Sequence, residues 1–164
     1  MILKADYIVG LTDGEGCFLA SFRRDSRIDL RFFISQAIGN KSLLEKVRQY
    51  FKIGSVYQKS DRSGHLPAWV FEVSKRDDIY NIVIPFFEKN KLQGYKAKSF
   101  NDFCKIAKVV KARQDIRKLT KKEVNYITFI KQRMNKYYGS PGAVNPLVGW
   151  ERAITSMKRN PSRQ

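Results

Sequence analysis

The sequence predicts an α+β fold with an antiparallel sheet, and two observations lead to this prediction. Apolar residues recur at helical spacing in several segments, whereas four short segments alternate between apolar and polar residues as strands do. These segments follow one another in the order helix, hairpin, helix, hairpin, helix. With 164 residues, of which 43% are hydrophobic, the chain has the length of one domain and enough apolar material for a core.

The first expected elements are a short helix and a hairpin. The helix begins near Ala5, and Gly14 and Gly16 are expected to reverse the chain at its end, because glycine tolerates the left-handed conformation found there. Two strands follow over residues 17–24 and 28–37. Alternation along both strands predicts one apolar face and one mixed, basic face.

A second helix and a second hairpin are expected next. Asn40 can cap a helix that carries a clear apolar stripe and ends near Phe51. Residues 55–59 and 68–74 have the pattern of two strands joined by a polar turn. The second hairpin therefore repeats the arrangement of the first.

The third helix is expected to be interrupted. Ser74 and Asp77 have the spacing of a capping box at its start. Pro85 lies inside its apolar pattern and lacks a backbone N–H, so we expect a kink or a break there.

Two further helices are expected towards the C-terminus. One follows Gly94 and has an apolar stripe through Phe100 and Phe103, and the other begins with a capping box of Thr120 and Glu123. We expect residues 1–138 to form the domain and residues 139–164 to form a basic tail.

The charge of the chain indicates the class of its partner. The sequence has 32 Lys and Arg against 15 Asp and Glu, a formal net charge of +17. Residues 1–90 hold 14 basic and 11 acidic residues, whereas residues 91–164 hold 18 and 4. A polyanion is the natural partner of such a chain, and nucleic acid is the commonest one. The lysines of the fourth helix and the tail are expected to add affinity that is independent of sequence.

Several other classes of protein are not expected. No apolar run reaches the length of about 18 residues that a membrane span needs. The first residues do not resemble a secretory signal, so we expect an intracellular protein in the compartment that holds its target genome, an organelle matrix or a microbial cytoplasm. Two cysteines and the single His65 leave no disulfide framework and no Cys/His metal cluster.

The chemistry is expected at the end of the first helix. Asp13 and Glu15 stand two residues apart among glycines, which allow a backbone or a phosphate to approach closely. Carboxylates repel a nucleic-acid backbone unless a cation lies between them. The pair therefore suggests a divalent-metal site, in which Mg²⁺ is held by a carboxylate, a backbone carbonyl and phosphate oxygens. The alternative is that the carboxylates only bind backbone groups at a turn.

Residues 8–16, Ile-Val-Gly-Leu-Thr-Asp-Gly-Glu-Gly, resemble the nine-residue LAGLIDADG motif, and Cys17 and Phe18 are also typical of that family. The similarity covers about residues 5–112 and extends over these segments: 32–36, 40–51, 53–56, 82–89 and 92–94. The chain thus resembles a single-motif LAGLIDADG homing endonuclease. The resemblance implies the αββαββα fold, here with extra C-terminal helices, whose antiparallel sheet forms a saddle on DNA.

A homodimer is expected because the sequence holds a single acidic motif. Hydrolysis of both strands of a duplex needs an acidic metal site for each strand, yet the sequence holds one such motif. A second copy supplies the missing carboxylate, and a two-fold interface matches a roughly palindromic duplex. The interface is expected on the motif helix, at Ile8, Gly10, Leu11 and Asp13, with Gly10 allowing close approach.

The resemblance also implies roles for single residues. Glu15 aligns with the metal-binding acid, Gly14 offers a carbonyl ligand, and Asp13 organises the end of the helix. The resemblance implies further catalytic residues: Gln36, which orients the attacking water, and a lysine near the scissile phosphate, either Lys96 or its competitor Lys91. Gln93 stands at a position that departs from the expected lysine.

Base recognition is expected on the face of the hairpins that does not join the core, because a two-stranded ribbon fits the major groove. Strand parity places these residues on it: Leu19, Ser21, Arg23, Asp29, Arg31, Phe33, Tyr57, Lys59, Val70 and Glu72. Arg23 and Arg31 are the expected guanine readers. Arg24, Arg27 and Arg62 at the hairpin tips are the expected phosphate contacts.

The predicted function is that of a homodimeric, Mg²⁺-dependent, site-specific DNA endonuclease, which makes a double-strand break with short 3′ overhangs as the resemblance to the family implies. Mn²⁺ or Ca²⁺ can occupy the same site. The alternative is an RNA maturase of the same fold that assists intron splicing, for which RNA would be the partner. The acid at position 15 favours the nuclease, because an RNA-binding protein has no need of it.

Overall fold

The computed structural model describes residues 3–23, 27–59, 67–112 and 119–136. Its elements, in chain order, are α1 (Ala5–Glu15), β1 (Gly16–Phe22), β2 (Ile28–Ala37), η1 (Ile38–Asn40), α2 (Lys41–Phe51), β3 (Ser55–Lys59), β4 (Ala68–Val73), α3 (Arg76–Asp78), η2 (Ile79–Val83), α4 (Ile84–Lys89), α5 (Lys96–Lys111) and α6 (Lys121–Lys136). The predicted α+β class and order of elements are confirmed. Within the described ranges, no helix is long and apolar enough to cross a membrane.

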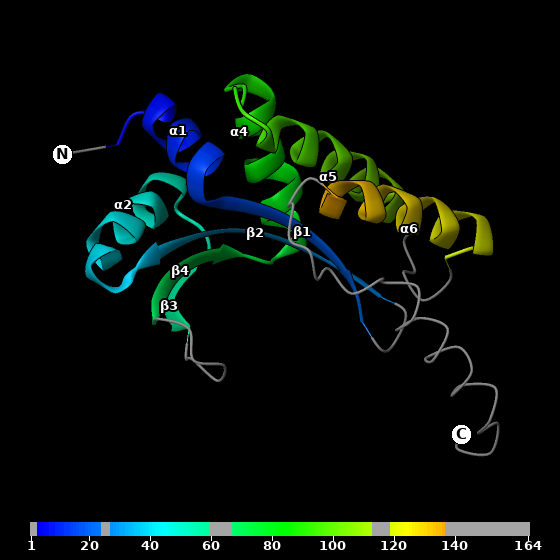
Figure 1. Ribbon diagram of the computed structural model, residues 1–164, viewed down its shortest axis with the longest axis horizontal. Coiled ribbons are helices and arrows are strands. Elements are labelled where there is room, and N and C mark those ends of the chain that lie inside the picture. Colours follow the sequence, from blue (N-terminus) through cyan, green and yellow to red (C-terminus); the bar gives the residue numbers. More distant parts are fainter. Residues whose placement is uncertain (1–2, 24–26, 60–66, 113–118, 137–164) are drawn as a thin grey trace, which may run out of the picture.

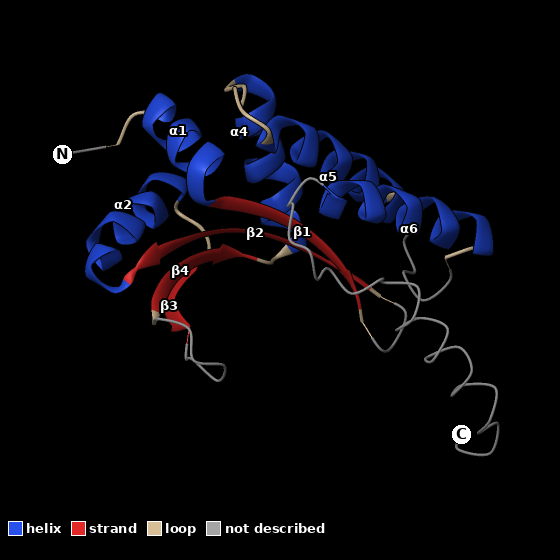
Figure 2. Cartoon of the chain, viewed as in Figure 1, coloured by secondary structure: helices blue, strands red, loops and turns tan. Residues whose placement is uncertain are grey.

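The four strands form one antiparallel sheet in the order β1-β2-β4-β3. Gly16 pairs with Ile34 across β1 and β2, and Tyr57 pairs with Val70 across β3 and β4. The sheet is curved, and α1, α4, α5 and α6 lie on one side of it (Figures 1 and 2). No described helix covers the opposite, concave side. The fold therefore offers one open sheet surface.

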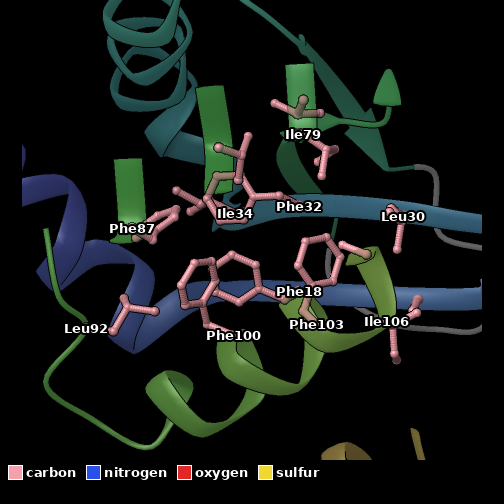
Figure 3. Close-up of a cluster of buried hydrophobic side chains, with 14 of the residues drawn as sticks. Phe18, Leu30, Phe32, Ile34, Ile79, Phe87, Leu92, Phe100, Phe103 and Ile106 are labelled. Carbon is pink, nitrogen blue, oxygen red and sulfur yellow. The ribbon is translucent and has the colours of Figure 1, made fainter. Parts of the chain in front are cut away.

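The core lies between the helices and the covered face of the sheet (Figure 3). Burial alternates along β1 from Gly16 to Ser21 and along β2 from Ile28 to Ile34, as the sequence pattern predicts. Phe18 stands at the centre, with its ring centroid 5.1 to 5.5 Å from four others: Phe32, Phe87, Phe100 and Phe103. Truncation of such a residue to alanine costs about 3–5 kcal/mol. This packing fixes the sheet against α4 and α5.

The end of α1 differs from the expectation. The helix runs through Gly14 to Glu15, and Gly16 adopts an extended conformation with φ −78° and not a left-handed one. Glycine is required at Gly16 for another reason, because a Cβ there would come within 2.5 Å of Thr12 Cγ2. Helix and strand are thus joined directly, and Glu15 is the last helical residue.

Two predicted helix caps are not formed. Asn40 precedes α2 but makes no capping hydrogen bond, and its Nδ2 donates to Gln36 Oε1 at 2.9 Å. Ser74 and Asp77 form no capping box, since α3 begins at Arg76 and its cap position is Lys75. Asn40 stands at the predicted cap position but binds Gln36 instead, whereas α3 begins one residue later than its predicted cap requires.

The predicted interruption of the third helix is confirmed. It is divided into α3, a π-helical segment (η2) and α4, and Pro85 lies in the first turn of α4. The backbone stays helical through this junction, since Ile84 N donates to Ile79 O in the π-helical pattern, whereas Pro85 has no N–H with which to continue the ladder. The wider π turn before it accommodates the ring.

The last helix is held by its cap and by a buried ion pair. Thr120 and Glu123 form the predicted capping box, with Thr120 N donating to Glu123 Oε2 at 2.8 Å and Glu123 N donating to Thr120 Oγ1 at 3.3 Å. Asp102 in α5 is 3% exposed and accepts from Arg133 Nε at 2.9 Å and from Lys105 Nζ at 3.1 Å. Arg133 Nη2 also donates to Asp102. These contacts fix α6 on α5.

The charges around Asp102 decide its ionisation. Burial by itself raises the pKa of Asp102, but the hydrogen bonds and charges of Arg133 and Lys105 outweigh burial and hold that pKa below its usual value. Asp102 is therefore ionised in the folded protein at neutral pH.

The expected boundary at residue 138 and the expected tail lie outside the described residues.

Candidate functional site

The acid that the motif singles out lies at an open position. Glu15 is exposed at the end of α1, directly before β1. Because Gly16 pairs with Ile34, Gln36 lies two residues beyond that pair on the antiparallel neighbour. Glu15 and Gln36 therefore stand at the same end of the β1–β2 ladder. The contact with Asn40 restrains the Gln36 side chain at this end.

Asp13 holds a segment that is 80 residues away in the sequence. Its Oδ2 accepts the backbone N–H of Gln93 at 2.8 Å, and its Oδ1 accepts that of Gly94 at 3.1 Å. A Cβ at Gly94 would lie 3.2 Å from Asp13 Oδ1, so a residue without a side chain is favoured there. Asp13 thus ties the end of α1 to the connection between α4 and α5. The sequence prediction that Asp13 organises the helix end agrees with this contact.

The two candidate lysines flank the segment that Asp13 binds. Lys91 is exposed, and its backbone carbonyl accepts Gln93 Nε2 at 3.0 Å. Lys96 begins α5 and is 8% exposed. The Asp13 contact thus lies between the two lysines, on the connection that leads from Lys91 to the start of α5. Lys91 is the more accessible of the two to a phosphate.

The described residues hold no group of three His, Cys, Asp or Glu side chains that could bind a metal ion by themselves. What they offer is the exposed carboxylate of Glu15, next to the backbone carbonyl of Gly14. Mg²⁺ is commonly bound by one or two carboxylates together with substrate phosphates and water. The donor set fits a divalent ion that is completed by DNA, and it does not fit a metal held by the protein alone.

The open face of the sheet carries the residues that parity placed on it. Register pairs these residues across the strands: Leu19 with Arg31, Cys17 with Phe33, Ser21 with Asp29, Phe33 with Glu72, and Tyr57 with Val70. Arg23, Tyr57 and Lys59 are exposed, and the others named are half-buried, with one exception. Val70 is only 3% exposed. The alternation of the strand predicted the face on which Val70 lies but did not predict that its side chain is buried. Arg24 and Arg62 lie outside the described residues, whereas Arg27 is half-buried beside the start of β2.

Two arginines of this face have acidic neighbours. Arg31 Nη1 lies 4.0 Å from Glu72 Oε1, and Arg23 Nη1 lies 3.7 Å from Asp29 Oδ1. Tyr57 Oη also donates to Glu72 Oε2 at 2.7 Å. Burial, this hydrogen bond and the charge of Glu72 raise the pKa of Tyr57 to about 12, so the phenol stays protonated as a donor. Sequence reasoning placed these residues on one face but missed their pairing, which depends on the register of three strands.

The lysines of α5 do not line the open face. Lys105, Lys108 and Lys111 belong to a helix on the covered side of the sheet (Figure 1). Lys105 binds Asp102, and Lys111 Nζ lies 5.2 Å from the centroid of the Tyr80 ring. The position of this helix therefore does not support the expectation that its lysines add affinity for DNA bound on the open face.

The exposed side of α1 forms a narrow stripe. Tyr7 is 50% exposed, and Gly10 and Gly14 are exposed at i+3 and i+7 from it. A Cβ at either glycine would meet no atom within 4 Å. Leu11 is half-buried beside this stripe. Tyr7 was missed by the sequence reasoning, although its spacing from the two glycines was a signal that could have found it.

Two residues of the expected dimer interface have other positions. Ile8 is fully buried in the core, so its assignment to an interface is wrong. It points to the sheet because it shares a helix face with Thr12, which is also fully buried. Asp13 is half-buried and binds the connection between α4 and α5 within the same chain.

Comparison with known proteins gives a consistent set of relatives. A family model described as LAGLIDADG endonuclease matches residues 8–107. A protein of Mycosarcoma maydis described as probable intron-encoded DNA endonuclease 1 is 34% identical over 95 residues, which are 57% of this chain and 34% of that protein. The chain spans between 20% and 34% of the length of the curated relatives that it matches.

Solved structures agree in fold with the chain. The homing endonuclease I-TnaI matches with a TM-score of 0.71 and 25% identity, over 97% of this chain and 99% of that one. I-GzeII in complex with its DNA target matches with a TM-score of 0.72 and 30% identity, over 84% of this chain and 45% of that one. I-SmaMI bound to uncleaved DNA in the presence of calcium ions matches with a TM-score of 0.71 and 26% identity, over 80% of this chain and 45% of that one.

The sequence, the fold and the relatives lead to one family. The match to the family model extends over more than half of the chain, and it includes the helix end that carries Asp13 and Glu15. The four-stranded antiparallel sheet with helices on one side is the fold shared with the solved homing endonucleases. The chain belongs to the LAGLIDADG endonuclease family.

Proposed function

We propose that the chain is the DNA-cleaving unit of a site-specific homing endonuclease, which binds a long, pseudo-palindromic duplex and hydrolyses a phosphodiester bond in each strand. The observation that carries the proposal is the position of Glu15, an exposed carboxylate at the junction between α1 and the open sheet. A carboxylate at such a junction is useful to a DNA-binding surface when a cation bridges it to a phosphate. The proposal includes action in the compartment that holds the target genome.

A divalent metal ion, with Mg²⁺ the first candidate, would neutralise charge on the phosphate and lower the pKa of a bound water. Glu15 and the carbonyl of Gly14 are the groups of this chain that would hold it. The structure of I-SmaMI with uncleaved DNA in the presence of calcium ions agrees with a role for a divalent metal. The requirement for Mg²⁺ in this protein is part of the proposal.

The remaining residues position the reacting groups. Gln36, restrained by Asn40, is proposed to orient the attacking water. Lys96 or Lys91 is proposed to stabilise the negative charge that develops on the phosphate, as preorganised cations do. Asp13 sets the distance between these lysines and Glu15 through its two backbone contacts.

We also propose that two copies act together through α1. Tyr7, Gly10 and Gly14 form the exposed stripe, and the glycines allow a second helix to approach closely. The matched I-GzeII chain is about twice as long as the part that this chain covers, in agreement with two such units acting on one duplex. Each copy would contribute one Glu15 to the cleavage of both strands.

The cleavage proposal is tested with a plasmid that carries the insertion point of the protein's own gene. The purified chain with Mg²⁺ is expected to convert it to the linear form, and EDTA is expected to stop the reaction. Product made equally well in EDTA would contradict the metal requirement. Absence of any product with Mg²⁺ or Mn²⁺, from protein that binds the plasmid, would contradict the nuclease proposal.

The dimer proposal is tested by analytical ultracentrifugation with and without DNA. The mass of the protein component is expected to be twice the 19.1 kDa of the chain. Gly10→Leu is expected to reduce it to one chain mass, because the side chain would separate the two α1 helices. A strict monomer of the wild-type chain on DNA would overturn the proposal.

The maturase alternative is not proposed. The curated relatives are described as probable intron-encoded endonucleases, and the solved relatives include complexes with DNA. No contact within the described residues favours RNA over DNA.

A further inference from the structure

Carboxylates lie among the arginines of the open sheet face. Arg31 has Glu72 at 4.0 Å, with 37% and 16% of their side chains exposed, and Arg23 has Asp29 at 3.7 Å, with 56% and 38% exposed. A surface that only attracts DNA would gain nothing from these acids. Their presence calls for a role other than affinity.

The backbone geometry puts the five charges in one cluster. Asp29 and Arg31 alternate with core residues along β2, so both lie on the open face, and Arg27, directly before β2, accepts the backbone N–H of Arg23 at 2.7 Å. Asp29 pairs with Ser21 in β1. Arg23 follows Ser21 by two residues and lies just beyond the end of that strand. The cluster of Arg23, Arg27, Arg31, Asp29 and Glu72 therefore carries three positive and two negative charges.

Glu72 is poorly placed to contact DNA itself. It is the less exposed member of its ion pair, and its Oε2 already accepts the Tyr57 hydroxyl at 2.7 Å. Across the ladder it pairs with Phe33 on one side and with Ser55 on the other, so strands flank it on both sides. Its carboxylate is thus held inside the face, next to Arg31 and Tyr57.

Arg31, in contrast, keeps donors for a further partner. At 4.0 Å its contact with Glu72 is an ion pair without a hydrogen bond. Its Nε is buried and has no partner among the described residues, so the guanidinium can reach outward only through its terminal nitrogens. A guanidinium restrained in this way can still bind the O6 and N7 atoms of guanine with two hydrogen bonds.

We propose that Glu72 and Asp29 are specificity-determining positioning residues, which hold Arg31 and Arg23 and reduce their attraction to phosphates along any duplex. An unpaired arginine binds phosphate at every position of DNA and thereby stabilises complexes with wrong sequences. An arginine beside a carboxylate releases fewer counterions from such complexes, whereas a bidentate guanine contact depends on its geometry. This inference rests on one part of the proposed function, which is that the open face binds duplex DNA.

The first experiment measures binding to DNA that has no matching site. The variants are Glu72→Gln and Asp29→Asn, which keep the shape of the side chain and remove one negative charge. The control is Glu45→Gln, which makes the same charge change beside Arg48 in α2, a helix whose buried residues join the core on the covered face of the sheet. The probe is a duplex of about 30 base pairs and arbitrary sequence, titrated in EDTA at several salt concentrations.

Both variants are expected to bind this duplex more tightly than the wild type, by about 3- to 10-fold at low salt, and with a salt slope steeper by up to about one unit. Glu45→Gln is expected to change the affinity less than 2-fold, with an unchanged slope. A purely structural role of Glu72 would lower affinity and would leave no steeper slope.

The second experiment measures selectivity. Duplexes are selected from a randomised pool by each protein, and the sequence preference is compared position by position. Glu72→Gln is expected to lose preference at the guanine that Arg31 contacts. Tyr57→Phe keeps the carboxylate but removes its hydrogen bond, and is expected to lower selectivity with no steeper salt slope.

The outcomes separate this inference from the proposed function. Equal affinity and equal slope of Glu72→Gln and the wild type on the arbitrary duplex would overturn the inference. Weaker binding of Glu72→Gln to all duplexes would also overturn it, because Glu72 would then be either a direct DNA contact or a purely structural residue. If the wild type bound no duplex at all, the proposed function would fail, and the carboxylates would be assigned to folding.

Discussion

Two aspartates of the helical layer hold segments together in different ways. Asp13, near the end of α1, is half-buried and accepts two backbone N–H groups from Gln93 and Gly94. Asp102 in α5 is 3% exposed and accepts hydrogen bonds from two cationic side chains, Arg133 and Lys105. Asp13 positions a backbone segment next to the exposed acid of the site. Asp102 attaches one helix to another.

The difference indicates which of the two contacts serves the proposed chemistry and which serves stability. Backbone amides are fixed in place, so a carboxylate that binds two of them determines the position of the whole connection that carries the candidate lysines. Side-chain cations are long and have other solvated positions, so a carboxylate that binds them contributes mainly to the free energy of folding. Loss of Asp13 should therefore affect the reaction, and loss of Asp102 should affect the unfolding equilibrium.

The largest expected effect follows from Asp13→Ala. Without its acceptors the connection between α4 and α5 can shift relative to Glu15, and a shift of about 1 Å lowers a rate about 100-fold. The measurement is the single-turnover rate of DNA cleavage with Mg²⁺. Asp13→Asn keeps one acceptor and should fall between the wild type and Asp13→Ala, whereas Asp77→Asn, an exposed control in α3, should react at the wild-type rate.

Stability should respond little to the same substitution. The loss of two exposed backbone contacts is expected to cost about 1 kcal/mol in the free energy of unfolding, as for a helix cap. Urea unfolding checks this value. A loss above about 3 kcal/mol with a normal cleavage rate would reverse the roles of the two aspartates.

Asp102→Asn is expected to give the opposite result. The change weakens a buried, charge-assisted network while its cationic partners can turn to solvent, so the expected loss is about 2 kcal/mol. In a domain of this size that corresponds to a decrease of about 4–8 °C in Tm. The cleavage rate at a temperature well below Tm should remain within about 2-fold of the wild type. A rate loss comparable to that of Asp13→Ala would contradict the comparison.

The pH dependence of stability gives a sharper test of the Asp102 network. Because the pKa of Asp102 is lowered in the folded state, the folded protein binds this proton less readily than the unfolded chain does. The stabilisation is therefore fully present above the unfolded pKa of about 3.9 and is lost as pH falls through the lower, folded pKa. The difference in unfolding free energy between the wild type and Asp102→Asn should be constant from about pH 5 to 8 and should shrink below about pH 4. A difference that persists unchanged at lower pH would show that charge is not its origin.

The smallest expected effect concerns the cap of α6. Thr120→Ala removes the hydroxyl that accepts Glu123 N–H and donates to Glu123 Oε2. Such a change costs about 1 kcal/mol. Thermal unfolding should show a decrease in Tm smaller than that of Asp102→Asn, with an unchanged cleavage rate. An effect larger than that of Asp102→Asn would mean that the cap, and not the ion pair, determines the docking of α6.

Features that depend on short repeats of side chains could be predicted from the sequence. Alternation in β1 and β2 gave the covered and the open faces, because side chains of a strand point in turn to opposite sides. The capping box of Thr120 and Glu123 was also predicted, since both partners lie within one helical turn. The motif itself gave the place of Glu15 at the end of α1 and the start of the sheet.

Features that depend on distant partners could not be predicted in this way. The partners of Asp13 are 80 residues away, and no local pattern indicates them. Asn40 has the right residue type for a cap, but the nearby Gln36 amide takes its side chain. Parity gave the face of Val70 but not its burial, which follows from its place in the sheet between the paired residues Ser35 and Tyr57.

The central claim is that Glu15 is the acid on which metal-dependent cleavage depends. The most direct measurement compares cleavage and binding of one duplex, taken from the insertion point of the gene, by the wild type, Glu15→Gln and the control Glu88→Gln, whose exposed acid lies in α4. The expectation is that Glu15→Gln binds the duplex with nearly the wild-type Kd and produces no cut strand in Mg²⁺, while Glu88→Gln cuts at the wild-type rate. Cleavage by Glu15→Gln at the wild-type rate would contradict it.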